Sequence, residues 1–195
     1  MKKQITIQQY RNIDLGIMLV IQLISQALIH FAANSWFPDQ LYVVSPVAAV
    51  TVLVMMRWGG FAAIHAMVGG LVFTALSGGN PGHYLIYGLG NAGALLALLA
   101  FRLFDKERIR KSAFLSLMLA LLVQALMWLG LAGMAALFGN EPAACLSFIT
   151  TDILSGLFTL LIVWVVRRID GLFEDQKHYL IRMERERQAE RRESH

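Results

Sequence analysis

One carboxylate lies inside a long apolar stretch near the end of the sequence, and it is the residue best placed to do chemistry. The stretch runs from Leu146 to Val166 and reads LSFITTDILSGLFTLLIVWVV, with Asp152 as its only charge. At about 1.5 Å per residue, a helix of this length crosses a hydrocarbon core of about 30 Å. A charge within a spanning helix is costly and usually faces a protein or water-filled interior. We therefore expect Asp152 to contact a ligand, although an Asp that is protonated or hydrogen-bonded within the bundle would fit the same pattern.

Other polar and aromatic residues are predicted near the same depth. Asn91 and Trp128 lie within one or two helical turns of the Asp152 layer, in the outer half of the membrane, and Gln124 lies about one turn deeper. The layer above them contains His30, Trp36, Asn80, His83, Tyr84 and Tyr87. Aromatic walls with a few convergent polar groups are typical of small-molecule sites, so we predict that these residues bind a substrate. Asn91 or Trp128 alone could instead serve packing or anchoring.

The sequence contains no motif that indicates catalysis. HExxH, GxSxG and P-loop patterns are absent, and His30, His65 and His83 come from different segments. The single cysteine, Cys145, excludes an internal disulfide and a cysteine-based metal cluster. We therefore expect no enzyme activity, no cofactor and no metal, and an intramembrane enzyme is the least favoured class.

The elements that would position these residues are predicted to be membrane-spanning helices. Of the 195 residues, 57% are hydrophobic and only 15% are charged, which indicates an all-α membrane protein. Apolar runs separated by breakers predict six spans, at residues 13–33, 41–56, 61–77, 84–104, 113–138 and 146–166, with a tight turn at Arg57–Gly60. The net charge of +4 is divided among the loops, so no nucleic-acid partner is expected.

The distribution of basic residues predicts the orientation of the chain. If both termini are cytoplasmic, all 17 Lys and Arg residues fall on the inner side, including those of the Asp105–Lys111 loop. The outer loops then carry only Asp39 and Glu141 as charges. This segregation follows the positive-inside rule and predicts a multi-pass protein of a prokaryotic plasma membrane, in contact with the lipid bilayer.

Small side chains recur every four residues in the third predicted span, at Ala62, Ala66, Gly70, Thr74 and Gly78. Such a stripe lets helix backbones approach closely in lipid. Packing within the bundle is one use of it. Docking of a second membrane protein against Ala62, Ala66 and Gly70 is the other.

The chain divides into a membrane domain at residues 1–170 and a charged cytoplasmic tail at residues 171–195. One helical face of the tail carries apolar and polar residues in the order Leu172, Phe173, Gln176, Tyr179, Leu180 and Met183. We expect that face to lie on the membrane surface or against a partner, while a plain juxtamembrane anchor is the alternative.

The pattern resembles the substrate-binding S components of energy-coupling-factor (ECF) vitamin transporters. The likeness covers about residues 13–170 and rests on the six short spans, the Arg57–Gly60 turn, the small-residue third span, GNPGHYLIYGLGNAG at residues 79–93 and ITTDILSG at residues 149–156. The AxxxA motif that the family often carries in its first span does not occur in the first span of this chain; the nearest match is Ala62 and Ala66.

The resemblance implies an S-component-like bundle that binds a vitamin or similar small nutrient. It also implies delivery of that nutrient to a membrane-embedded T component and two ABC ATPases, because the chain has no nucleotide-binding motif of its own. A membrane sensor or adaptor that signals through its cytoplasmic C-terminal helix is the alternative. Neighbouring genes for a T component or an ABC ATPase would separate the two.

Overall fold

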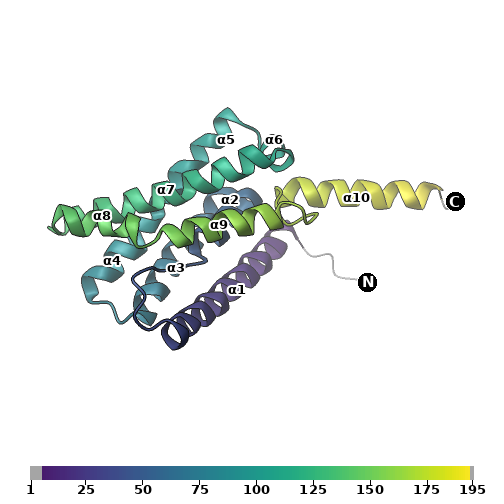
Figure 1. Cartoon of the computed structure of the whole chain (residues 1–195). Helices are drawn as coiled ribbons and strands as arrows, with labels where there is room; N and C mark the ends of the chain where they lie inside the picture. The colour runs from purple at the N-terminus through teal and green to yellow at the C-terminus, as the bar shows by residue number, and fades with distance from the viewer. Residues whose placement is uncertain (1–5, 194–195) are drawn as a thin grey trace.

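The structure is a computed structural model, and it describes the backbone of residues 6–193 and the side chains of residues 6–186. The regular secondary structure of this part of the chain is all helical, with no strands. Figure 1 shows the helices as an elongated bundle with α10 projecting from one end. The elements are α1 (Ile7–Trp36), α2 (Val47–Trp58), η1 (Gly59–Phe61), α3 (Ala62–Leu76), α4 (Pro81–Gly90), η2 (Asn91–Leu99), α5 (Ala100–Leu103), α6 (Lys106–Lys111), α7 (Ala113–Leu137), α8 (Pro142–Thr150), α9 (Ile153–Val166) and α10 (Gln176–Glu193).

Five helical segments of the described chain are long and apolar enough to cross a membrane. They are Ile7–Trp36, Val47–Leu76, Pro81–Leu103, Ala113–Leu137 and Pro142–Val166. The expectation of an all-α membrane protein is therefore confirmed at this level. The predicted count was six, and the difference arises because the second and third predicted spans fall within the one segment Val47–Leu76.

That segment turns back on itself at the predicted breaker. Helix α2 ends at Trp58, and Gly59 has φ +62°, a backbone conformation that favours glycine. Val47 at the start of α2 packs against Gly69 in α3, so the two helices run antiparallel. With 12 and 15 residues, α2 and α3 are each shorter than the roughly 20 residues that a spanning helix needs. Neither arm alone therefore has the length of a full span.

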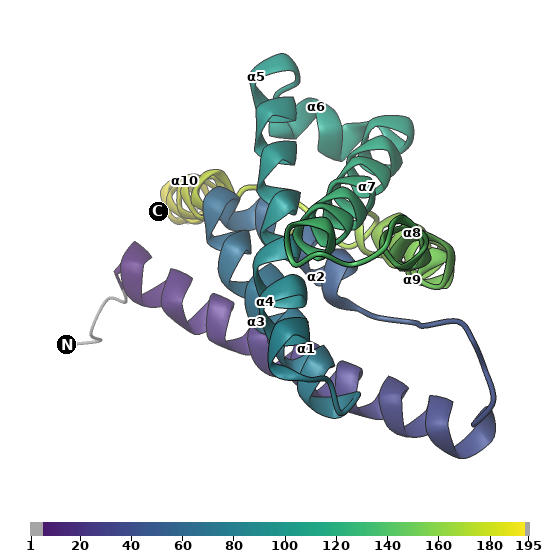
Figure 2. The ribbon, with the colours of Figure 1, turned by 90° about the vertical axis from the view of Figure 1, so that its left-hand side faces the viewer.

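The second predicted span does not begin as a helix at Leu41. Residues 39–45 have no regular secondary structure, and α2 starts only after Pro46. Proline disfavours helical backbone in the residue before it and cannot donate a ladder hydrogen bond. Figure 2 shows this segment as a long connection that returns from the end of α1 to the bundle.

Helix α2 forms the centre of the bundle. Its residues are buried from Val47 to Arg57, and it contacts α1, α3, α7 and α9. The sequence VAAVTVLVMM is apolar on every side, which is typical of a helix that is surrounded by others. The site described below lies where the start of α2 meets α7 and the α8–α9 junction.

The small-residue stripe of α3 packs inside this bundle. Ala62 and Ala66 are fully buried, and a Cβ at Gly70 would overlap the backbone carbonyl of Tyr87 in α4. Ala62, Ala66 and Gly70 are therefore buried against other parts of the bundle. The packing use of the stripe is thus present in the structure, and docking of a second membrane protein against these three buried residues stays a prediction.

Figure 1 shows α6, α10 and the start of α1 at one end of the molecule, while α4 and α8 lie toward the opposite end. Arg57 is 6% exposed and forms two hydrogen bonds to Asp14, of 2.9 Å and 2.6 Å. Its third donor group reaches the carbonyl oxygens of Gly171 and Leu172 at 2.8 Å and 3.0 Å. The predicted turn at Arg57 therefore holds α1 and the segment after α9 together.

The first residues of the tail are packed into the bundle instead of lying on a surface helix. Gly171 has φ +73°, and α10 begins only at Gln176. Phe173 is 1% exposed and belongs to the hydrophobic core. The predicted helical face that began at Leu172 was wrong in this part, because residues 172–175 are not helical and Phe173 packs in the core.

Ion pairs connect α6 to the segment before α10. Lys106 Nζ lies 2.7 Å from Asp175 Oδ2, and Arg110 Nη1 lies 3.0 Å from Glu174 Oε2. Arg182 of α10 approaches Glu174 to 2.9 Å. Burial disfavours the charged form of Asp175, but the hydrogen bond and charge of Lys106, together with the contacts of His178, outweigh burial and lower the pKa of the carboxyl group.

Candidate ligand site at the α8–α9 junction

Asp152 lies at a break in the helix that was predicted to be continuous. Helix α8 ends at Thr150 and α9 begins at Ile153, with Asp152 at φ −100° and ψ 12°. The carbonyl oxygen of Thr151 accepts a hydrogen bond of 2.8 Å from the backbone N–H of Val43. Irregular backbone at membrane depth is tolerated where it is buried in protein or lines a cavity, and interrupted helices often mark binding sites.

The segment before α2 is fastened to α9 beside this break. The hydroxyl of Ser155 accepts a 2.8 Å hydrogen bond from the backbone N–H of Ser45 and donates to the carbonyl of Val43 at 3.3 Å. These bonds provide partners for the N–H of Ser45 and the carbonyl of Val43, which lie outside any helix. The connection between α1 and α2 therefore forms one wall of the site.

Neutral donors hold the carboxylate of Asp152. Gln124 Nε2 and Trp128 Nε1 donate to Asp152 Oδ2 over 3.0 Å and 2.8 Å. Gln124 and Trp128 are four residues apart in α7 and so share a face of that helix. Thr159 donates to Gln124 Oε1 at 3.3 Å and orients the amide. The structure thus brings together three residues of the predicted layer.

No cation accompanies this carboxylate among the described residues. The ion pairs there involve Asp14, Asp170, Asp175, Glu107 and Glu174, and none involves Asp152. The same part of the chain contains no group of three His, Cys, Asp or Glu side chains that could hold a metal ion. A carboxylate in low-dielectric surroundings is stabilised by a positive partner, and the described residues supply none to Asp152.

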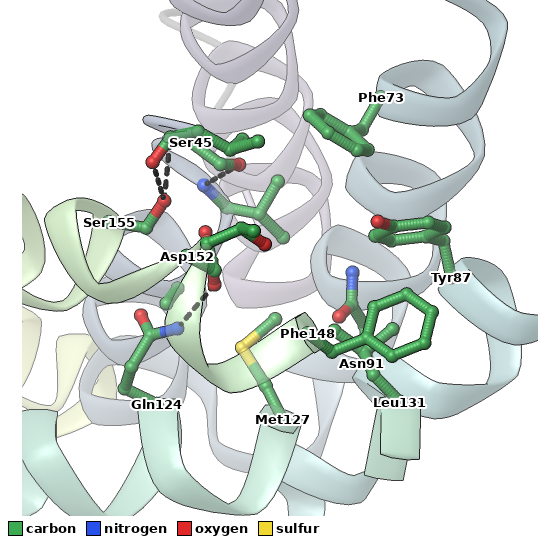
Figure 3. Close-up of a pocket in the computed structure, with 14 residues that line it drawn as sticks. Ser45, Phe73, Tyr87, Asn91, Gln124, Met127, Leu131, Phe148, Asp152 and Ser155 are labelled. Carbon is green, nitrogen blue, oxygen red and sulfur yellow. Dashed lines mark hydrogen bonds between the residues drawn. The ribbon is translucent and has the colours of Figure 1, made fainter. Parts of the chain in front are cut away.

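A cavity of about 40 Å³ lies beside Asp152. Figure 3 shows its lining residues, which come from the α1–α2 connection, α2, α3, α4, η2, α7, α8 and α9: Val43, Ser45, Val47, Ala48, Phe73, Tyr87, Asn91, Gln124, Met127, Leu131, Phe148, Thr151, Asp152 and Ser155. At about 10–15 Å³ for one water, the cavity has room for about three waters or a small functional group. It is smaller than the roughly 300 Å³ of a pocket that encloses a whole drug-sized ligand.

Aromatic rings form the wall across from Asp152. The ring centroid of Tyr87 lies 5.0 Å from that of Phe73 and 5.6 Å from that of Phe148. Figure 3 shows Asp152 and Tyr87 on opposite sides of the cavity. Tyr87 belongs to the predicted set, but Phe73 and Phe148 do not. Their sequence signal is weak, since phenylalanine is common in spanning helices; the one pointer to Phe148 is its place a helical turn before Asp152.

Asn91 lines the cavity and also packs helices together. Its Nδ2 donates to the carbonyl oxygen of Ala66 at 3.3 Å, and its side chain is 5% exposed. That contact links the start of η2, which follows α4 directly, to α3. The packing role considered for Asn91 is present in the structure together with its position at the cavity.

A larger cleft of about 310 Å³ adjoins the cavity, and both are lined by Val43 and Phe73. The cleft lies between the end of α1 and the connection to α2. It contains His30 of the predicted set, whose Nε2 is 2.8 Å from Asn34 Nδ2, and also the buried Gln26.

Five predicted residues line neither space: Trp128, which still donates to Asp152, and four that do not reach it. Trp36 is 75% exposed at the end of α1, and His83 and Tyr84 are exposed near the start of α4. Asn80 caps α4 by accepting a 3.1 Å hydrogen bond from the backbone N–H of His83. These four residues are near the same end of the bundle, but the structure does not bring them to Asp152.

Comparison with known proteins identifies no relative of this chain. No protein family matches the sequence, and neither a curated protein nor a solved structure is similar to it.

Proposed function

We propose that this chain is a membrane protein that binds a small nutrient, in the manner of the S component of an ECF-type importer. The observation that carries the proposal is the half-buried carboxylate of Asp152. It lies at a helix break beside a cavity and has only neutral donors from Gln124 and Trp128. A structural Asp in lipid needs no adjoining cavity, whereas a ligand contact does.

The proposal includes a topology and a set of partners. The chain would cross the plasma membrane six times with both termini in the cytoplasm, the arms α2 and α3 acting as two short crossings. A T component and two ABC ATPases would supply the energy for uptake. The resemblance to S components supports this assembly, as does the position of the basic α6, the start of α1 and α10 at one end of the bundle (Figure 1). The chain itself would not act as an enzyme.

The test is to purify the protein in lipid nanodiscs and measure its intact mass under non-denaturing conditions. We expect a fraction of the protein to carry a small molecule, which denaturation releases for identification. Proteoliposomes that contain only this chain should bind that molecule but not accumulate it against a gradient. ATP-driven or ion-driven accumulation by the chain alone would contradict the S-component proposal.

A sensor or adaptor is the second candidate, and the attachment of α10 favours it. The ion pairs of Lys106 with Asp175 and of Arg182 with Glu174 connect α10 to the charged end of the bundle. A change in the bundle could therefore move α10. Under this alternative, ligand binding alters the position of α10, and uptake does not depend on a T component.

A further inference from the structure

We propose that the cavity at Asp152 and the adjoining cleft at Gln26 form one site for a small organic cation, whose ammonium group lies at Asp152. The ligand body would carry a hydrogen-bond donor that reaches Gln26. This inference rests on the proposed function and names the chemical class of its ligand.

The charge of the head group follows from the surroundings of Asp152. Among the described residues, its hydrogen-bond partners Gln124 and Trp128 are neutral, and no Lys, Arg or His pairs with it. An anionic head group would add a second negative charge to a poorly solvated site, which is strongly unfavourable. A cation would supply the partner that the described residues lack.

The aromatic wall favours an ammonium group. Tyr87 lies across the cavity from Asp152, and Phe73 and Phe148 flank its ring at centroid distances of 5.0 Å and 5.6 Å (Figure 3). The negative face of an aromatic ring attracts a cation within about 6 Å, and the attraction is stronger when the cation is desolvated. A carboxylate on one side and aromatic rings on the other together select an organic cation over a neutral head group.

The size of the cavity limits what lies beside Asp152. Its volume of about 40 Å³ accommodates an ammonium group with one or two carbons. The rest of the ligand would extend past Val43 and Phe73, the two residues that line both spaces. Beyond them is the cleft of about 310 Å³, which is large enough for a small ligand body.

Gln26 indicates what that body carries. Its side chain is 3% exposed and lines the cleft, and its Nε2 donates to the carbonyl of Gly69 at 3.0 Å. That bond fixes the amide and leaves Oε1 without a hydrogen-bond partner; Oε1 itself is fully covered, so a ligand donor would reach it by displacing part of the cleft lining. Since a buried unsatisfied acceptor is costly, a donor on the ligand would relieve the cost.

The structure also provides a matched control for Gln26. Gln22 lies one turn earlier in α1, and its Nε2 donates to the carbonyl of His65 at 2.9 Å while its Oε1 also lacks a partner. Gln22 does not line the cleft. The two residues therefore make similar packing contacts, but only Gln26 can meet a ligand there.

The experiment measures thermal unfolding of the purified protein in nanodiscs, after removal of any bound molecule, with a matched set of probes. Linear amino alcohols of about three to eight carbons carry an ammonium head and a hydroxyl donor. Diols of the same lengths are neutral, hydroxy acids are anionic, and simple alkylamines lack the donor. We expect the best amino alcohol to bind at least about tenfold more tightly than its diol or hydroxy acid, which corresponds to about 1.4 kcal/mol.

Two variants test the two ends of the site. Asp152→Asn should abolish the preference for the amino alcohol over the diol. Gln26→Leu should abolish the preference for the amino alcohol over the alkylamine, and Gln22→Leu should retain it. If either variant unfolds, Gln26→Met and Asp152→Ser replace it in the same comparison.

Several results would overturn the assignment. They are equal binding of diols, a cation preference that survives Asp152→Asn, stabilisation by Na⁺ alone as large as that by the amino alcohols, or no binding of any amino alcohol. If the intact protein nevertheless carries a neutral or anionic small molecule, the ligand class is wrong while the proposed function stands. If no small molecule binds at all, both fail.

Discussion

The contact between Gly90 and Gly130 gives a sharp test of how α4 and α7 pack beside the site. A Cβ at Gly130 would overlap the carbonyl oxygen of Gly90, and it would lie 3.0 Å from the carbonyl carbon. The atoms it meets belong to the backbone and cannot rotate away. Gly130→Ala should therefore force the two helices apart. Gly133→Ala is the matched control, because nothing lies within 4 Å of its Cβ position.

The expected magnitude comes from comparing the two variants. Replacing glycine by alanine within a helix gains about 1 kcal/mol of helix propensity, and this gain applies to both positions. The difference between the variants therefore isolates the overlap, which costs about 1–3 kcal/mol as in an overpacked core. For a chain of this size, each kcal/mol shifts the melting temperature by about 2–4 °C.

The assay is thermal unfolding of the purified variants in one detergent, followed by tryptophan fluorescence. We expect Gly130→Ala to melt about 2–12 °C below Gly133→Ala. Gly133→Ala itself should melt at or above the wild-type temperature. Equal melting temperatures for the two variants would refute the close approach of α4 and α7.

The remaining predictions concern the charged end and the topology. Asp14→Asn should lower the free energy of unfolding by about 3–5 kcal/mol, because it leaves Arg57 buried without a counter-charge, while Asp39→Asn in an exposed segment should change it little; chemical unfolding of both variants measures this. The pKa of Asp175 is lowered, so its contribution to the docking of α10 should persist above about pH 4 and be lost as the pH falls further through the folded-state pKa. In wild type, the distance between α6 and α10 measured by fluorescence should therefore increase at low pH. Lys106→Met should weaken the docking at neutral pH and remove that pH dependence. In a Cys145→Ser background, single cysteines at Gly82 and Glu141 should react with an impermeant reagent from outside intact cells and a cysteine at Asp105 only after permeabilisation; labelling of position 82 only after permeabilisation would defeat the proposed topology.

Apolar length and breakers were sufficient to predict most of the helical elements. The fourth and fifth predicted spans, residues 84–104 and 113–138, correspond closely to Pro81–Leu103 and Ala113–Leu137. The turn after Arg57 was predicted from its two glycines, and Gly59 adopts the positive φ that glycine permits. These features depend on local chemistry, which the sequence records directly.

The break at Asp152 could not be predicted in the same way. The residues Thr150, Thr151 and Asp152 include no glycine or proline, and the surrounding run is apolar enough for a continuous helix. The interruption is accompanied by a tertiary hydrogen bond from Val43 to Thr151, which lies more than 100 residues away along the chain. Such a partner can be identified only once the chain is folded.

The candidate site, too, was predictable from the sequence only in part. Counting residues along the spans placed Asp152, Trp128 and Gln124 near one another, and the structure joins them by hydrogen bonds. The same count could not separate Tyr87, which lines the cavity, from Tyr84, which is exposed. Side-chain direction on a helix depends on how the helix is rotated in the bundle, and depth alone does not determine that rotation.

The most direct test of the proposed site is a calorimetric titration of the identified ligand into wild type, Asp152→Asn and the control Asp39→Asn. Asparagine keeps the size of the side chain and an acceptor for Gln124 and Trp128, so the variant should remain folded while it loses the negative charge. We predict that Asp152→Asn weakens binding at least about tenfold, or about 1.4 kcal/mol, with an unchanged melting temperature in the absence of ligand, and that Asp39→Asn binds like wild type. Equal affinities for wild type and Asp152→Asn would show that Asp152 does not contact the ligand and would contradict the proposed site.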